Sequence, residues 1–213
     1  GTFMKTLKEA KILGSGLKKI GKAFSINTEI VYTNMNQPLG KYAGLRCEIL
    51  ESIDCLNGHG PSDLMEITLE LGSKILIQSK IVTNNQIAID MMLESIENKT
   101  ALNKFKEIIS SQGGDIDTLI REGVTKNNSI IIRSRESGFI KSIKTDEIGW
   151  ALVEMRAGRK KENDKLDYLA GIEFINKVGD KVNKGDSIFR IFGKDPKRLN
   201  NAKKMLKKAY SLT

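Results

Sequence analysis

The sequence has little of the chemistry on which many small enzymes depend. Among its 213 residues are two cysteines, one histidine, one tryptophan and three prolines, and aromatic residues make up only 6%. The single histidine, His59, excludes a metal site with two histidine ligands and makes any Ser-His-Asp or Cys-His arrangement depend on one residue. Its neighbours Gly58 and Gly60 indicate an exposed turn between helices. No Cys-x-x-Cys pair is present, and no glycine-rich dinucleotide fingerprint follows a predicted strand.

Long apolar runs are also missing. The longest ones are too short to span a bilayer, and the first residues have no basic segment followed by an apolar stretch and a cleavage site. We therefore expect a cytoplasmic protein without a membrane partner. The two cysteines, Cys47 and Cys55, fall in one predicted helix at a separation of roughly 12 Å along its axis, so they cannot bridge each other. Both are interpreted as small apolar residues in a reducing compartment.

The net charge of +9 is concentrated at the C-terminus. Residues 194–213 hold seven basic residues against the one acid Asp195, which accounts for +6 of the excess. In this tail apolar residues recur every three or four positions, which predicts a terminal amphipathic helix with a solvated lysine face: Leu199, Ala202, Met205, Leu206, Ala209 and Tyr210. Because aromatic residues that could stack on bases are not interleaved with the lysines, no nucleic-acid partner is expected.

The most informative segment is the polar loop Asn34–Gly40. Before it, Thr28–Thr33 is rich in β-branched and aromatic residues and predicts a strand, whereas Leu45–Leu56 after it has helical spacing. In α/β sheets, ligands bind at the carboxyl ends of strands, so this loop is a candidate site. A plain connection between a strand and a helix remains the alternative.

The rest of the first half is mainly helical. Helices are predicted over Met4–Phe24, Asp63–Ser79, Asn85–Glu97 and Ala101–Ser111. One strand cannot form a sheet, so its partners lie elsewhere in the chain or outside it. The run Gly16–Ala23 nearly matches a phosphate-binding P-loop, but it lacks the metal-binding hydroxyl and sits inside a helical pattern, so we reject that motif.

The pattern changes to short β-rich runs after Gly123. Strands are predicted at Ser129–Arg133, Gly138–Ile143, Ala170–Phe174 and Ser187–Phe192, and turns at Lys177–Asp186. A helix over Asp146–Met155 interrupts them, with Thr145 as its predicted N-cap. We place a domain boundary near residues 123–128. The predicted domains are an α/β part, residues 1–125, and a C-terminal α+β domain with a small mixed or antiparallel sheet, residues 126–213.

One cation site can be argued from spacing. Leu39 and Tyr42 lie in an irregular turn whose backbone carbonyls are free to face a ligand, and Glu51 follows two helical turns later. Two carbonyls and a carboxylate form an oxygen cluster that suits a hard cation. Paired carboxylates elsewhere do not stand out from an ordinary helix surface, so no catalytic constellation is evident.

Six short motifs occur in an order and at spacings that resemble one enzyme family. They are Gly1–Thr6, Thr33–Gly40, Asn57–Leu64 with Thr68–Gly72, Gln112–Asp115, Ala157–Arg159 and Val178–Val182. Together they span nearly the whole chain and are similar to the pyrimidine nucleoside phosphorylases and thymidine phosphorylases.

The resemblance implies a pentosyltransferase of nucleoside salvage, in which phosphate as co-substrate attacks the sugar of a pyrimidine nucleoside. The family is homodimeric and uses no organic cofactor. Its α/β phosphate-binding domain precedes a C-terminal α+β domain, and its catalytic residues lie before the segment that matches Gly1. The chain therefore resembles the C-terminal half of such an enzyme and is expected to be inactive alone.

Individual residues can be carried over from the family. Phe3 matches a residue that lines the nucleoside pocket, with core packing as the alternative. Leu39, Tyr42 and Glu51 match positions that bind a potassium or calcium ion together with residues of the other half.

The chain also departs from the family pattern at three places. Asn34 replaces an aspartate, Leu45 and Arg46 replace an Asn-Ala pair, and Arg156 replaces a glycine. These changes affect the expected detail near the loop and the substrate preference, which the sequence leaves open between thymidine and uridine.

Two other functions stay open. The patterns at Gly138–Ile143 and Val178–Ile191 resemble lipoyl and biotinyl carrier domains, although the short motif around their modified lysine is absent. A nucleoside-monophosphate phosphorylase is close in family but differs in substrate, and the run Met35–Pro38 favours the pyrimidine enzymes over it.

Overall fold

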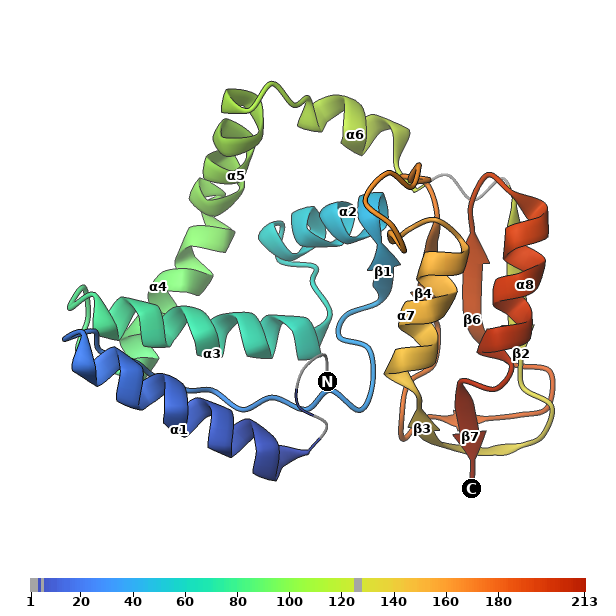
Figure 1. Cartoon of the computed structure of the whole chain (residues 1–213). Helices are drawn as coiled ribbons and strands as arrows, with labels where there is room; N and C mark the ends of the chain where they lie inside the picture. Colours follow the sequence, from blue (N-terminus) through green and yellow to red (C-terminus); the bar gives the residue numbers. More distant parts are fainter. Residues whose placement is uncertain (1–3, 5, 125–127) are drawn as a thin grey trace.

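A computed structural model describes residues 4, 6–124 and 128–213 of the chain. The helical part comprises α1 (Leu7–Ala23), α2 (Leu45–Leu56), α3 (Ser62–Gln78), α4 (Asn85–Glu97), α5 (Thr100–Ser111) and α6 (Ile116–Glu122), with the short strand β1 (Tyr42–Gly44) before α2. The C-terminal part comprises β2 (Ser129–Arg133), β3 (Gly138–Ile143), α7 (Thr145–Glu154), β4 (Gly171–Phe174), β5 (Lys181–Val182), β6 (Ser187–Phe192), α8 (Pro196–Leu206) and β7 (Tyr210–Leu212). Figure 1 shows the two parts side by side, with β1 at the junction. The predicted combination of a mostly helical part and a C-terminal α+β domain is confirmed.

The strand predicted at Thr28–Thr33 is wrong. These residues are extended, but within the described ranges they pair with no strand. They lie along α1, where Gly14 and Gly21 are buried. A Cβ atom at Gly14 would lie 2.6 Å from the hydroxyl of Tyr32, and one at Gly21 would lie 3.0 Å from the carbonyl oxygen of Ile26. Strand propensity was present, but a strand also needs a hydrogen-bonding neighbour, and the segment packs against the glycines of α1 instead.

Two small antiparallel sheets organise the C-terminal part. The strand orders are β1-β4-β6-β2 and β5-β3-β7. The first sheet contains β1 from the helical part, with Tyr42 opposite Glu173 and Gly44 opposite Gly171. Of the two predicted arrangements, a mixed or an antiparallel sheet, the structure has the antiparallel one. The backbone pairing of β1 with β4 joins the helical part to the C-terminal part.

A single hydrophobic core lies between the two sheets and the two C-terminal helices. Phe189 is fully buried in β6, and its ring packs edge-on against Phe174 at 5.8 Å and against Tyr210 at 5.9 Å. Helices α7 and α8 pack on each other, and α8 contacts β2 and β6. Alternation along β6 is weak because this strand is central in its sheet and buried on both faces.

Several helix boundaries differ from the predictions by a few residues, and two of the differences change the role of a residue. Lys144 is the N-cap of α7, not Thr145, whose hydroxyl donates to the carbonyl of Met35 at 3.2 Å. The terminal helix ends at Leu206, and Tyr210 belongs to β7, which pairs with β3. Helix α6 and the short strands β5 and β7 were not predicted. Among the described residues, no helix has the length and apolar character needed to cross a membrane.

Candidate functional site

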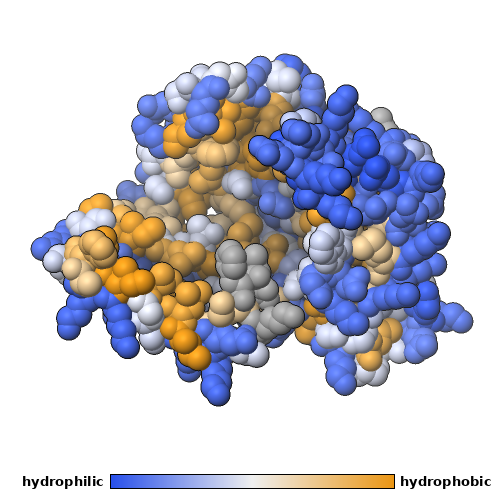
Figure 2. All heavy atoms as spheres, in the orientation of Figure 1, coloured by the Kyte–Doolittle hydropathy of each residue, from blue (hydrophilic) through white to orange (hydrophobic). Residues whose placement is uncertain are grey.

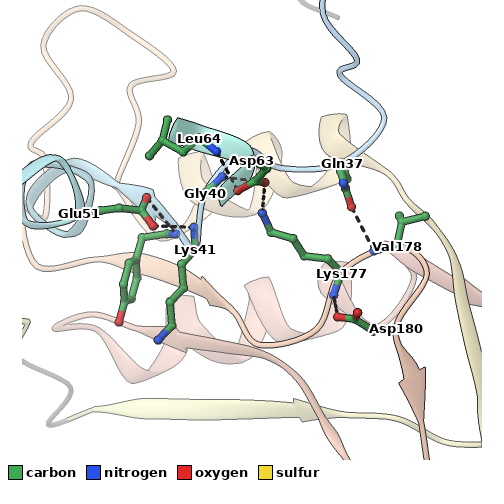
Figure 3. Close-up of polar contacts among 10 residues, drawn as sticks. Gln37, Gly40, Lys41, Glu51, Asp63, Leu64, Lys177, Val178 and Asp180 are labelled. Carbon is green, nitrogen blue, oxygen red and sulfur yellow. Dashed lines mark hydrogen bonds and ion pairs between the residues drawn. The ribbon is translucent and has the colours of Figure 1, made fainter. Parts of the chain in front are cut away.

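The Asn34–Gly40 loop lies at the junction of the two parts and is held mainly by distant residues. The side chain of Gln37 accepts a hydrogen bond from the backbone N–H of Val178 at 3.1 Å, and Met35 accepts one from Thr145. At the end of the loop the N–H of Gly40 donates to Asp63 at 3.3 Å. Figure 3 shows the contacts of Gln37 with Val178 and of Gly40 with Asp63. The loop is therefore fixed from outside its own sequence neighbourhood.

Asn34 begins the loop with a local hydrogen bond. Its side-chain oxygen accepts from the N–H of Asn36 at 2.9 Å. An aspartate has the same acceptor, so this departure from the family preserves the turn. Arg46 has a different role: its guanidinium reaches the carbonyl of Leu119 at 3.3 Å and the carboxylate of Glu122 at 2.8 Å, which links α2 to α6.

Glu51 is the buried carboxylate next to this loop. It is 5% exposed and accepts hydrogen bonds from the N–H of Lys41 at 2.6 Å and from that of Tyr42 at 3.4 Å. Burial raises the pKa of Glu51, although the two backbone donors and the charge of Lys177 oppose this shift. Gly40 has φ +69°, and a Cβ atom there would lie 2.7 Å from a Glu51 oxygen. A glycine is thus required at this position both by conformation and by space.

The predicted cation ligands are only partly brought together. The carboxylate of Glu51 faces the backbone of Tyr42. Because the ladder hydrogen bond to β4 is accepted by Lys41, the carbonyl of Tyr42 points away from β4, toward the Glu51 side. The role of these two oxygens as cation ligands stays a prediction. Leu39 is 41% exposed, and its role stays a prediction. No group of three or more His, Cys, Asp or Glu side chains suited to a metal occurs in the described part of the chain.

A cleft of about 580 Å³ opens beside the loop. Its lining includes Gln37, His59, Asp63 and Lys177. His59 is exposed, as its flanking glycines indicate, and within the described ranges no hydrogen bond joins it to Asp63. The geometry does not assemble a catalytic triad around the single histidine.

An ion pair between Asp63 and Lys177 closes one side of this cleft. The Lys177 Nζ atom contacts the Oδ2 atom of Asp63, and the side chains of Lys177 and Asp63 are 23% and 31% exposed, respectively. Burial opposes ionisation of Asp63, but the hydrogen bond and charge of Lys177, with the N–H groups of Leu64 and Gly40, lower its pKa. The sequence did not predict this pair, because 114 positions separate its members.

A second carboxylate, Glu173, joins β1, β4 and β6. It is 6% exposed and accepts from Tyr42 at 3.3 Å and from Arg190 at 2.8 Å, with Lys41 at 3.5 Å. Three elements thereby share one buried negative charge. The pattern of β4 could not identify Glu173 as a buried charge, because all four residues of that strand are buried and polar and apolar faces do not alternate.

Two further predictions concern single residues. Phe3, the predicted substrate contact, lies outside the described residues. Cys47 and Cys55 are both free thiols, as predicted, and burial raises the pKa of Cys47 to about 12.

Comparison with known proteins agrees with the fold. Residues 139–213 match the family model described as "Pyrimidine nucleoside phosphorylase C-terminal domain". The chain is similar to a thymidine phosphorylase of Metamycoplasma hominis, with 40% identity over 199 residues that cover 92% of this chain and 73% of that protein. It is 37% identical over 193 residues to a pyrimidine-nucleoside phosphorylase of Staphylococcus haemolyticus, covering 90% of this chain but 45% of that protein. The chain therefore spans less than half the length of this staphylococcal relative. On these similarities, the chain belongs to the thymidine and pyrimidine-nucleoside phosphorylase family.

Proposed function

We propose that the complete protein containing this chain is a pyrimidine-nucleoside phosphorylase of nucleoside salvage in the cytoplasm. A phosphate oxygen forms a bond to C1′ of the sugar while the bond from C1′ to the base nitrogen breaks. The bonding electron pair leaves with the base, which takes up a proton, and the products are the free pyrimidine and a pentose 1-phosphate. The observation that carries the proposal is the 40% identity to a thymidine phosphorylase over 92% of this chain.

In this reaction the chain has a structural role and contributes no reacting group. Among the described residues, three carboxylates at the junction of the two parts are engaged in structural contacts: Asp63 pairs with Lys177, Glu51 accepts backbone N–H groups, and Glu173 pairs with Arg190. None of them is placed as a nucleophile or a general acid with a free partner group. We infer that residues outside this chain supply the phosphate-binding and base-binding groups.

The candidate cation site belongs to this support. The Glu51 carboxylate and the Tyr42 carbonyl would hold a potassium or calcium ion together with groups from the rest of the protein, and Leu39 would add a carbonyl. An ion there would neutralise the buried charge of Glu51 and hold the loop end against α2.

The complete protein is also proposed to be a homodimer. Along α1 and just beyond it, large apolar side chains are exposed: Leu7, Ile12, Leu13, Leu17, Ile20, Phe24 and Ile26. Figure 2 shows apolar atoms gathered over this helix. A surface of this kind favours a protein contact over solvent. We expect sedimentation of the complete protein to give twice the mass of its chain.

The experiment that tests the function compares two proteins. The product of the complete reading frame and the 213-residue chain are each incubated with phosphate and thymidine, uridine or AMP, and release of the base is measured. We expect base release from the pyrimidine nucleosides with the complete protein and none with the chain alone. Turnover of AMP in preference to thymidine and uridine would favour a nucleoside-monophosphate phosphorylase. Robust turnover by the isolated chain would disprove our placement of the catalytic groups.

A further inference from the structure

The turn between β4 and β5 is a preformed platform for contacts with the helical part. Its first N–H, that of Lys177, donates to the carboxylate of Asp180 at 2.7 Å, and the N–H of Asp180 donates back to the carbonyl of Lys177 at 3.1 Å. Gly179 adopts φ +96° and donates its N–H to the carbonyl of Ile140 in β3 at 2.9 Å. These bonds close the turn on itself and tie it to β3 of the C-terminal part.

Two groups of this platform reach the helical part. The N–H of Val178 donates to the side-chain oxygen of Gln37 in the middle of the Asn34–Gly40 loop, and the Lys177 ammonium pairs with Asp63. Figure 3 shows the Val178 contact with Gln37 of the loop and the Lys177 contact with Asp63, at the start of α3. Gln37 and Val178 are 141 positions apart in the sequence, and Asp63 and Lys177 are 114 positions apart, so both contacts form only when the two parts are docked.

A short chain of bonds continues from Asp63 to the buried carboxylate. The Oδ2 atom of Asp63, which pairs with Lys177, also accepts from the N–H of Gly40. The next residue, Lys41, donates its N–H to Glu51 at 2.6 Å. Two successive backbone N–H groups, those of Gly40 and Lys41, are therefore each held by a carboxylate, and one of these carboxylates, Asp63, is paired with Lys177. The charge of Lys177 also favours the ionised form of Glu51.

We propose that Lys177 and Val178 are positioning residues: through Asp63 and Gln37 they hold the Asn34–Gly40 loop so that the backbone next to Glu51 keeps one conformation. The importance of that conformation for turnover rests on the proposed function, whereas the geometry itself does not. The C-terminal domain would then determine the shape of a site to which it contributes no reacting group.

Amide hydrogen exchange of the 213-residue chain tests the geometry directly. The variant Lys177→Met keeps the length of the side chain but removes its charge, Lys177→Arg keeps the charge, and Lys181→Met is the matched control at an exposed lysine of β5. We expect exchange in residues 34–44 to be about five- to tenfold faster in Lys177→Met, unchanged in Lys181→Met and largely restored in Lys177→Arg. Peptides from β2 and β6 serve as internal references.

A second variant tests the same loop independently, in case Lys177→Met disturbs folding of the whole chain. Gln37→Leu removes the acceptor of the Val178 N–H on the helical side, and it is expected to accelerate exchange in residues 34–44 without altering the reference peptides. Unchanged exchange of the loop in both Lys177→Met and Gln37→Leu overturns the proposal. Acceleration that spreads equally to β2 and β6 also overturns it, because that pattern reports general unfolding.

Activity of the complete protein separates this proposal from the proposed function. If wild type releases base from pyrimidine nucleosides, Lys177→Met should lower kcat/KM roughly tenfold, and Lys177→Arg should recover most of it. If wild type releases none, the proposed function fails, and the exchange experiment still decides the positioning role.

Discussion

The hydroxyl of Tyr42 donates a hydrogen bond to Glu173 over 3.3 Å, although the two residues are 131 positions apart in the sequence. The bond links β1, which lies between α1 and α2 in the helical part, to β4 of the C-terminal part. Burial and the neighbouring Glu173 carboxylate raise the pKa of Tyr42 to about 12, so the hydroxyl remains a donor at all physiological pH values.

Removing either partner should weaken this junction. We expect Tyr42→Phe to lower the free energy of unfolding by about 1 kcal/mol, and Glu173→Gln to lower it by about 1–3 kcal/mol, because Arg190 and Lys41 also lose their charged partner. Urea denaturation measures both values. Tyr168→Phe is the control, since Tyr168 is 64% exposed. Equal effects of Tyr42→Phe and Tyr168→Phe would show that the buried bond contributes nothing.

The two thiols should differ in reactivity. Thiolate is the reactive form, and burial raises the pKa of Cys47 to about 12, with the thiol only 2% exposed. Burial also raises the pKa of Cys55, which is only half-buried. We expect iodoacetamide at pH 8 to modify Cys55 first in the native protein and Cys47 only after unfolding. The variant Cys55→Ala should then be almost inert when native; rapid modification of Cys47 in it would contradict the burial.

Alanine substitutions at two glycines of α1 should distinguish the effect of packing on stability from the effect of helix propensity. Gly21 is buried where an added Cβ atom meets the backbone of Ile26, whereas nothing lies within 4 Å of a Cβ atom at Gly16. Because alanine is the better helix former, Gly16→Ala should stabilise the protein by about 0.5–1 kcal/mol. The same change at Gly21 should destabilise it by about 1–3 kcal/mol through overpacking. Thermal unfolding of the two variants provides the comparison, and a stabilised Gly21→Ala would mean that residues 26–32 do not pack on α1.

Arg156 should carry a conformational cost. It follows α7 with φ +65°, and the hydrogen bonds from Arg156 to Val153 and from Ala157 to Leu152 form a Schellman motif, which favours glycine at this position. We expect Arg156→Gly to stabilise the protein by about 0.5–1 kcal/mol, with Arg159→Gly as the control for loss of a basic side chain. A loss of stability in Arg156→Gly alone would indicate that the arginine side chain makes a compensating contact.

The ion pair of Asp63 should give stability that depends on pH. The pKa of Asp63 in the folded protein lies below its ordinary value of 3.8, so its ionised form is favoured by folding. The resulting stabilisation is present above pH 3.8 and is lost as the pH falls through the lower folded value. The difference in unfolding free energy between wild type and Asp63→Asn should therefore be constant from about pH 5 to about pH 7. It should shrink as the pH falls below 3.8. A difference that grows in acid would refute the assigned direction.

Local patterns in the sequence predicted most of the elements. Helix α2 at Leu45–Leu56, α4 at Asn85–Glu97 and the strands β2, β3 and β6 have the predicted bounds. These segments carry their own periodicity, and packing reinforces it. Prediction was wrong where the outcome depended on a partner element. Thr28–Thr33 has strand propensity but packs against α1 without pairing to a strand. Tyr210 continues a helical spacing but belongs to β7, which pairs with β3.

The candidate site shows the same division. Spacing alone placed Glu51 two turns into α2, because a helix fixes such distances within one element. The contact of its carboxylate with the backbone N–H of Tyr42 joins α2 to β1. The Asp63–Lys177 pair, the Gln37–Val178 bond and the Glu173 cluster could not be predicted, since each joins residues that no local pattern connects.

The sequence by itself determined most of the helical and strand segments, the family to which the chain belongs, and the inability of its cysteines to bridge. Only the tertiary structure decided that β1 completes the C-terminal sheet and that the turn after β4 holds the Asn34–Gly40 loop. The physical reason is that periodicity and turn chemistry act between near neighbours in the chain, whereas strand pairing and buried ion pairs depend on which surfaces meet when the two parts dock.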